Sequence, residues 1–117
     1  MNDLKALIAI CRTALAGGNK AVSTLRKRRL TKEEKELLVA ASHKLGTFHF
    51  CFVDPVARGC IRAGSKQFFD SNDHAYSTKY LEAFQSLCER GYVEYRSGKL
   101  FVLNSLGYER AARLTKS

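Results

Sequence analysis

Basic side chains carry the clearest chemical signal in this chain, and phosphate is the ligand that they suit. The 117 residues include 20 Lys/Arg and 11 Asp/Glu, so the formal charge is +9 at pH 7. Residues 1–30 hold 7 Lys/Arg and 1 Asp (+6), whereas residues 31–117 hold 13 Lys/Arg and 10 Asp/Glu (+3). This excess favours a polyanionic partner. One basic run is a candidate phosphate-contacting segment, with a solvated helix end as its alternative: Arg26, Lys27, Arg28 and Arg29.

The cysteines and histidines show no metal-site pattern. No C-x-x-C pair and no histidine at ligand spacing accompanies the four cysteines, which are Cys11, Cys51, Cys60 and Cys88. The histidines are scattered, at His43, His49 and His74. We expect no metal, and reduced cysteines that pack as small apolar side chains. A hairpin over residues 47–63 would bring Cys51 and Cys60 face to face, and a disulfide there is the alternative.

Enzymatic motifs are absent from the sequence. It contains no glycine-rich phosphate loop, no G-x-S-x-G elbow and no H-E-x-x-H pair. Glu94-Tyr95-Arg96 faintly resembles the E-x-K of metal-dependent nucleases, with Asp54 or Asp70 as the other carboxylate. Strand alternation alone explains Glu94 as an outward-facing residue. We therefore expect a non-enzymatic protein without a cofactor.

The N-terminus only partly resembles a signal peptide. Ala14-Leu15-Ala16 has the form of a cleavage site, but the apolar stretch of residues 6–11 is too short. Asp3, Lys5 and Arg12 also interrupt its surroundings. No stretch approaches transmembrane length. These features predict a cytoplasmic protein that does not bind membranes.

Apolar residues at alternating spacings of four and three predict a helical seam near the N-terminus. Gly17-Gly18-Asn19 interrupts this seam, so we favour two short helices over a single helix that runs to about Arg28. In both cases the seam must be covered, either by the domain itself or by a second copy of the chain. Its side chains are thus candidate dimer-interface residues: Leu4, Ile8, Cys11, Leu15, Val22 and Leu25.

The middle of the chain predicts a helix followed by a β-hairpin. Thr31 and Glu34 have the spacing of a capping box and start the helix, which Gly46 ends. Residues 47–53 alternate as a strand with three phenylalanines on one face, and residues 59–63 form the return strand. Residues 66–70 are ambiguous between a short strand and one helical turn.

The C-terminal part predicts a helix, a second hairpin and a closing helix. Ser71-Asn72-Asp73 caps a helix from about residue 74 to residue 90, and Gly91 ends it. Residues 92–96 and 99–103 are β-rich runs joined by Ser97-Gly98. Asn104 or Ser105 caps the final helix.

From Tyr80 onward this order resembles the winged-helix superfamily, and the resemblance extends more loosely over residues 31–115. It implies an α+β fold in which a helix, a β-hairpin, a helix, a β-hairpin wing and a helix follow one another. Residues 31–117 would form this domain and residues 1–30 a basic helical extension. The chain departs from the simple family pattern, because the first hairpin and the Phe68-Phe69 piece stand where a second helix would be.

In that family the helix before the wing often enters the DNA major groove. Carried onto this chain, the resemblance implies contacts from the helix residues Thr78, Lys79 and Gln85 and from the wing-tip cations Arg96 and Lys99. Two glutamates on the same helix stripe would repel phosphate, so we expect mainly phosphate contacts with limited base readout. The expected function is a small regulator that binds double-stranded DNA. The alternative is a protein-interaction or dimerisation module on the same scaffold, as in small bacterial or phage accessory proteins.

Overall fold

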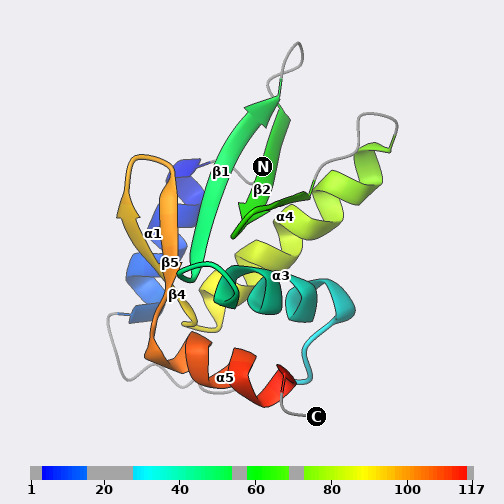
Figure 1. Cartoon of the computed structure of the whole chain (residues 1–117). Coiled ribbons are helices and arrows are strands. Elements are labelled where there is room, and N and C mark those ends of the chain that lie inside the picture. Colours follow the sequence, from blue (N-terminus) through cyan, green and yellow to red (C-terminus); the bar gives the residue numbers. More distant parts are fainter. Residues whose placement is uncertain (1–3, 16–27, 54–57, 69–72, 116–117) are drawn as a thin grey trace.

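A three-stranded meander and a β-hairpin join into one antiparallel sheet, and the helices of the described residues cover one face and one end of it (Figure 1). The computed structural model describes residues 4–15, 28–53, 58–68 and 73–115. Its helices are α1 (Leu4–Leu15), α3 (Lys32–Ser42), α4 (His74–Glu89) and α5 (Ser105–Thr115). Its strands are β1 (Thr47–Val53), β2 (Arg58–Ala63), β3 (Lys66–Phe68), β4 (Val93–Ser97) and β5 (Leu100–Leu103). The expected α+β class is confirmed.

The sheet has the order β3-β2-β1-β5-β4, and β1 is its central strand. Phe48 of β1 lies opposite Ala63 of β2 on one side and opposite Phe101 of β5 on the other. Because side chains alternate along a strand, this register turns Phe48, Phe50 and Phe101 towards the helices, where each is at most 1% exposed. The pairing of β1 with β5 joins two hairpins that local sequence patterns predict only separately.

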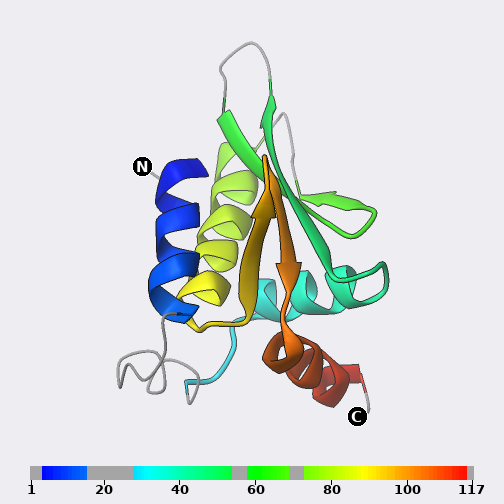
Figure 2. The same cartoon turned by 90° about the vertical axis from the view of Figure 1, so that its left-hand side faces the viewer.

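The helices cover one face of the sheet and leave the other open. Both α1 and α4 lie on the same side, and α3 and α5 pack together at one end of the sheet (Figure 2). In the described part of the chain, no helix covers the opposite face beyond that end. Nor does any described helix combine the length and apolarity needed to cross a lipid bilayer.

Helix α1 belongs to the same hydrophobic core as the rest of the domain. Leu7 and Cys11 are both 0% exposed, and α1 packs against α4 and β4. Leu4 and Ile8 lie partly buried against this core. A boundary at residue 30 therefore separates segments that share one core. For Leu4, Ile8 and Cys11, the domain itself covers the predicted seam.

Several predicted end signals are confirmed at the atomic level. The Thr31 amide donates to Glu34 Oε1 (2.9 Å) and the Glu34 amide donates to Thr31 Oγ1 (3.2 Å), which closes the capping box. Asp73 Oδ1 accepts from the amides at the start of α4, and Gly91 ends that helix with φ 78°. Of the two residues proposed to cap α5, Asn104 does so, since its Oδ1 accepts from the Gly107 amide at 2.9 Å.

Three details differ from the sequence prediction or resolve it. The second hairpin turns at Gly98-Lys99 rather than at Ser97-Gly98. Of the ambiguous segment 66–70, Lys66–Phe68 form a strand with Phe68 buried in the core, and residues 69–70 lie outside the described residues. At the end of α3, Leu45 adopts a left-handed conformation (φ 59°) before Gly46 (φ 65°), although the pattern predicted the glycine alone to end the helix there.

Candidate nucleic-acid interface

The β4–β5 hairpin, called the wing below, contains a bulge that moves its turn. Tyr95 pairs with Phe101 and Ser97 pairs with Leu100, so β4 has one residue more than β5, namely Arg96. Gly98 then adopts φ 52° at the turn, and its carbonyl accepts a hydrogen bond from the Tyr95 hydroxyl at 3.1 Å. Both Arg96 and Lys99 are exposed. The wing thus presents two cations beside a turn that Tyr95 holds.

A third cation reaches the wing from α1. The Arg12 guanidinium lies over the Tyr95 ring, 5.9 Å from its centroid, and is exposed to solvent. The ring itself packs edge-on against buried Phe101, with centroids 5.3 Å apart. Arg12 therefore lies on Tyr95, the residue that precedes Arg96 in the chain. Sequence reasoning missed Arg12, because nothing in local spacing links α1 to a strand so far along the chain.

The exposed stripe of α4 is as acidic as the sequence predicted. Thr78, Lys79, Glu82 and Glu89 are exposed and Gln85 is half-buried. The hydroxyl of the neighbouring Ser86 donates to Glu34 Oε2 at 2.9 Å. Two carboxylates against one lysine give this stripe no net attraction for phosphate.

Half of the basic run before α3 lies within the described residues. Arg28 and Arg29 have exposed side chains, and their carbonyl oxygens accept from the Arg90 guanidinium at 2.8 and 3.3 Å. Arg26 and Lys27 lie outside the described residues. Figure 2 shows the wing turn at one end of the β4–β5 hairpin and the segment leading into α3 near the other end. The two groups of cations are therefore separate.

Arg90 and Glu34 form a buried ion pair, which sequence reasoning also missed. They are 4% and 2% exposed, and Arg90 Nε donates to Glu34 Oε2 at 2.8 Å. Arg90 Nη2 lies 3.4 Å from Glu34 Oε1, the oxygen that also closes the capping box with the Thr31 amide. One glutamate thus joins the start of α3 to the end of α4. Through its bonds to the carbonyls of Arg28 and Arg29, Arg90 also holds the backbone that leads into α3.

The rest of the predicted dimer seam cannot be followed in the structure. Val22 and Leu25 lie outside the described residues, as does the side chain of Leu15.

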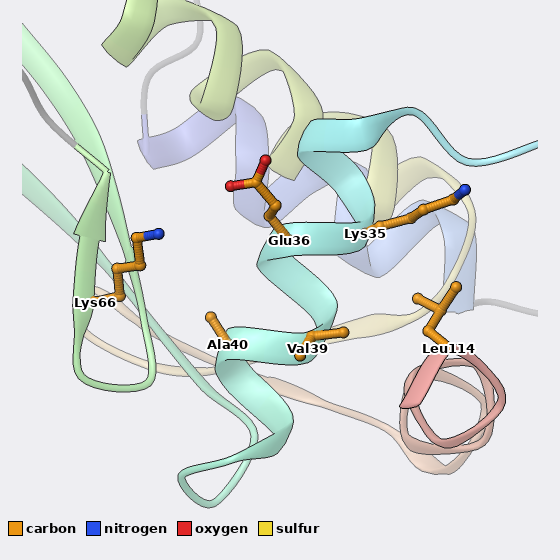
Figure 3. Close-up of a pocket in the computed structure, with 6 residues that line it drawn as sticks. All are labelled: Lys35, Glu36, Val39, Ala40, Lys66 and Leu114. Atoms are coloured by element: carbon orange, nitrogen blue, oxygen red, sulfur yellow. The ribbon is translucent and has the colours of Figure 1, made fainter. Parts of the chain in front are cut away.

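A hollow of about 540 Å³ lies between α3, β3 and α5 (Figure 3). Its lining consists of Lys35, Glu36, Val39, Ala40, Lys66 and Leu114. Glu36 Oε2 accepts from the Tyr80 hydroxyl at 2.9 Å, and burial together with this carboxylate raises the pKa of Tyr80. The Lys66 ammonium lies 5.0 Å from the centroid of the Phe68 ring. The lining mixes both signs of charge, with Lys35 and Lys66 near Glu36.

No group of three or more His, Cys, Asp or Glu residues in the described part of the chain could hold a metal ion. Comparison with protein-family models, curated proteins and solved structures finds no match to this chain. The candidate binding residues are Arg96 and Lys99 on the wing and Arg12 over the Tyr95 ring; these three are called the wing cations below.

Proposed function

We propose that this chain is a non-enzymatic nucleic-acid-binding module that contacts the phosphates of duplex DNA through its wing. The observation that carries the proposal is the placement of Arg12 on Tyr95, which adds a cation from α1 to the two on the wing. Three exposed cations, two on the wing and one over the Tyr95 ring, suit a backbone or minor-groove contact. The order α4, β4, β5 and α5 is also the order on which the winged-helix resemblance rests.

The proposed binding mode is electrostatic and reads little sequence. Glu82 and Glu89 lie on the exposed stripe of α4, where a groove-reading helix would have to approach phosphate. Thr78, Lys79 and Gln85 are therefore secondary contacts in this proposal. Arg28 and Arg29, with the rest of the basic run, would form a second phosphate contact away from the wing.

A titration of a fluorescent DNA duplex tests this proposal by anisotropy at two salt concentrations. The test variant replaces the three wing cations with alanine, and the control replaces Lys32, Lys44 and Arg113, which are also exposed. Because each lost phosphate contact lowers the slope of log K against log salt by about 0.9, the wing variant should lose about 2–3 of that slope. The control has the same net charge and should bind nearly as well as the parent chain.

Two outcomes would contradict the proposal. If both variants lose the same affinity, binding depends on net charge alone and the wing has no special part in it. If the parent chain does not bind at low salt, nucleic acid is not its partner.

One observation favours a protein-interaction module as the second candidate. Leu45 is 83% exposed in a left-handed conformation that costs leucine about 1–2 kcal/mol. Gly46, the next residue in the chain, lies against Tyr108, which is 42% exposed. A Cβ added at Gly46 would clash with the Tyr108 hydroxyl. An exposed apolar side chain in a strained turn suits a contact with a second copy of the chain.

Sedimentation velocity over a range of protein concentrations tests this second candidate. Leu45→Asn relieves the backbone strain and removes the apolar side chain, so it should keep the fold and abolish self-association. Substitutions at Leu4 or Ile8 are less informative, because both residues pack against the chain's own core. A parent chain that stays monomeric throughout would count against a second copy as the partner.

A further inference from the structure

The β1–β2 hairpin places two cysteines directly opposite each other. Cys51 pairs with Cys60, so both side chains point to the same face of the sheet. In the same register the Gly64 amide donates to the Thr47 carbonyl at 2.8 Å, and hydrogen-bonded pairs recur at every second residue. Cys51 and Cys60 therefore form a hydrogen-bonded pair, whose Cα atoms lie about 5.5 Å apart. Disulfides span Cα distances of about 4.4–6.8 Å.

The two thiols differ in access to solvent. By strand alternation, both cysteines lie on the face of the sheet opposite to the buried phenylalanines. Helices α1 and α4 do not lie on that face (Figure 2). Cys51 is half-buried, whereas Cys60 is 0% exposed and accepts a hydrogen bond from Gln67 Nε2 at 3.5 Å. Burial raises the pKa of Cys60, and the Gln67 amide partly offsets this effect. A soluble reagent thus meets Cys51 first, with Cys60 beside it.

The other two cysteines form a contrasting pair. Cys11 of α1 and Cys88 of α4 are both 0% exposed and lie in the core between these helices. Burial and the neighbouring Cys11 raise the pKa of Cys88 well above its usual value. Because a reagent cannot reach this pair without local unfolding, it serves as an internal control.

We propose that Cys51 and Cys60 form a thiol–disulfide exchange site for small disulfides of the glutathione class. The Cys51 thiol releases its proton and attacks one sulfur of the small disulfide, whose S–S bond breaks and whose first half leaves as a thiolate. The Cys60 thiol then releases its proton and attacks the Cys51 sulfur, which displaces the second half. The two departing thiolates take up two protons, so the cysteine pair loses two electrons and the small disulfide gains them.

The geometry makes this bond reversible. Cβ atoms in a hydrogen-bonded pair lie about 5.5 Å apart, whereas a disulfide brings them to about 3.8 Å. Closing the bond must therefore draw β1 and β2 together, and a strained, partly exposed disulfide is readily reduced. An excess of the reduced small thiol should restore both cysteines.

The test exposes the folded full chain to oxidised glutathione, then unfolds it in denaturant together with an alkylating reagent, so that every remaining thiol is blocked, and measures the intact mass. We expect two of the four cysteines to escape alkylation. Peptide mapping should then find a single bridge between Cys51 and Cys60. Four alkylated cysteines, a bridge that involves Cys11 or Cys88, or a bridge between two chains would overturn the proposal. This experiment needs no variant, so a failure of any variant to fold cannot obscure it.

Serine variants test the order of attack. Cys60→Ser lacks the second thiol and should accumulate one glutathione on Cys51, whereas Cys51→Ser should not react. Cys88→Ser is the matched control and should form the same bridge as the parent chain. Equal behaviour of the Cys51 and Cys60 variants, each checked for folding by circular dichroism, would contradict the assigned roles.

Discussion

Arg90 and Arg12 each contact a residue far away in the chain, but Arg90 is buried in an ion pair whereas Arg12 is exposed. Arg90 is 4% exposed and bonded to the Glu34 carboxylate and to two backbone carbonyls, so its charge is compensated inside the protein. Arg12 is exposed, and its guanidinium lies over the Tyr95 ring. The comparison teaches that a net charge of +9 does not tell which cations can meet a partner. Packing decides that.

The contact of Glu34 with Arg90, called the α3–α4 junction, and the contact of Arg12 with Tyr95, called the α1–wing junction, also differ in what they contribute to stability. A buried ion pair is costly to break, because the remaining charge stays desolvated. An exposed cation over an aromatic ring contributes only about 0.5–1 kcal/mol. The α3–α4 junction, with Glu34 and Arg90, should therefore be structural. The α1–wing junction, with Arg12 and Tyr95, should matter more for binding than for folding.

The largest expected effect is at the α3–α4 junction. Arg90→Met leaves the Glu34 carboxylate buried without its ion-pair partner and should lower the free energy of unfolding by about 3–5 kcal/mol. Urea denaturation followed by circular dichroism measures this loss. Arg113→Met removes an exposed arginine of α5 and should cost less than about 0.5 kcal/mol. Similar losses in the two variants would erase the contrast between buried and exposed cations.

A smaller loss of stability is expected when the Tyr95 ring beneath Arg12 is removed. Tyr95→Ala removes a half-buried side chain that packs on Phe101 and ties the wing turn, so unfolding should become easier by about 2 kcal/mol. It should also weaken DNA binding, because the wing cations lose their common support. Tyr95→Phe keeps the ring and should cost less than about 1 kcal/mol. Unchanged DNA binding in the alanine variant would show that Tyr95 does not organise the wing cations.

Arg12 itself should separate binding from folding. Arg12→Ala should lower the free energy of unfolding by no more than about 1 kcal/mol, while the salt dependence of DNA binding loses the share of one phosphate contact. Arg12→Lys retains the charge and should recover most of that salt dependence. Parallel urea denaturation and anisotropy titrations check both parts. A large stability loss without a change in binding would reverse the roles of the two junctions.

The smallest expected effect concerns a second hydrogen bond between α3 and α4, which the Tyr80 hydroxyl donates to Glu36. Burial and Glu36 raise the pKa of Tyr80 above its usual 10.0, so the folded chain keeps a proton that the unfolded chain releases in alkali. Unfolding then releases protons, and stability must fall as the pH rises above about 10. Tyr80→Phe removes this titration while other tyrosines remain in both proteins. Thermal unfolding between about pH 9 and pH 11 should therefore show a shallower decline in the variant than in the parent chain.

Local signals predicted most of the elements. The capping box of Thr31 and Glu34, the Asp73 cap and the Gly91 stop each act within a few residues, and all three are confirmed. The wing turn was predicted one residue too early, because a bulge at Arg96 changes the count along β4 without altering its alternating pattern. Leu45 was not expected to adopt a left-handed conformation, since leucine gives no local signal for it.

The candidate site was only half predictable. Arg96 and Lys99 followed from the hairpin pattern, whereas Arg12 depends on how α1 lies against β4. The basic run was visible as composition, but its backbone contacts with Arg90 were not. The DNA titration tests the proposal that the winged-helix resemblance extends to function.

By itself, the sequence determined most of the helices and strands, several of their end signals and the basic balance of the chain, because these depend on neighbours a few residues apart. The tertiary structure alone decided that β1 joins β5, that Glu34 meets Arg90 and that Arg12 rests on Tyr95. It also sorted the four cysteines into a buried pair and a cross-strand pair. The physical reason is that periodicity shows which face of an element is buried, but only the packing of all the faces together selects the partner.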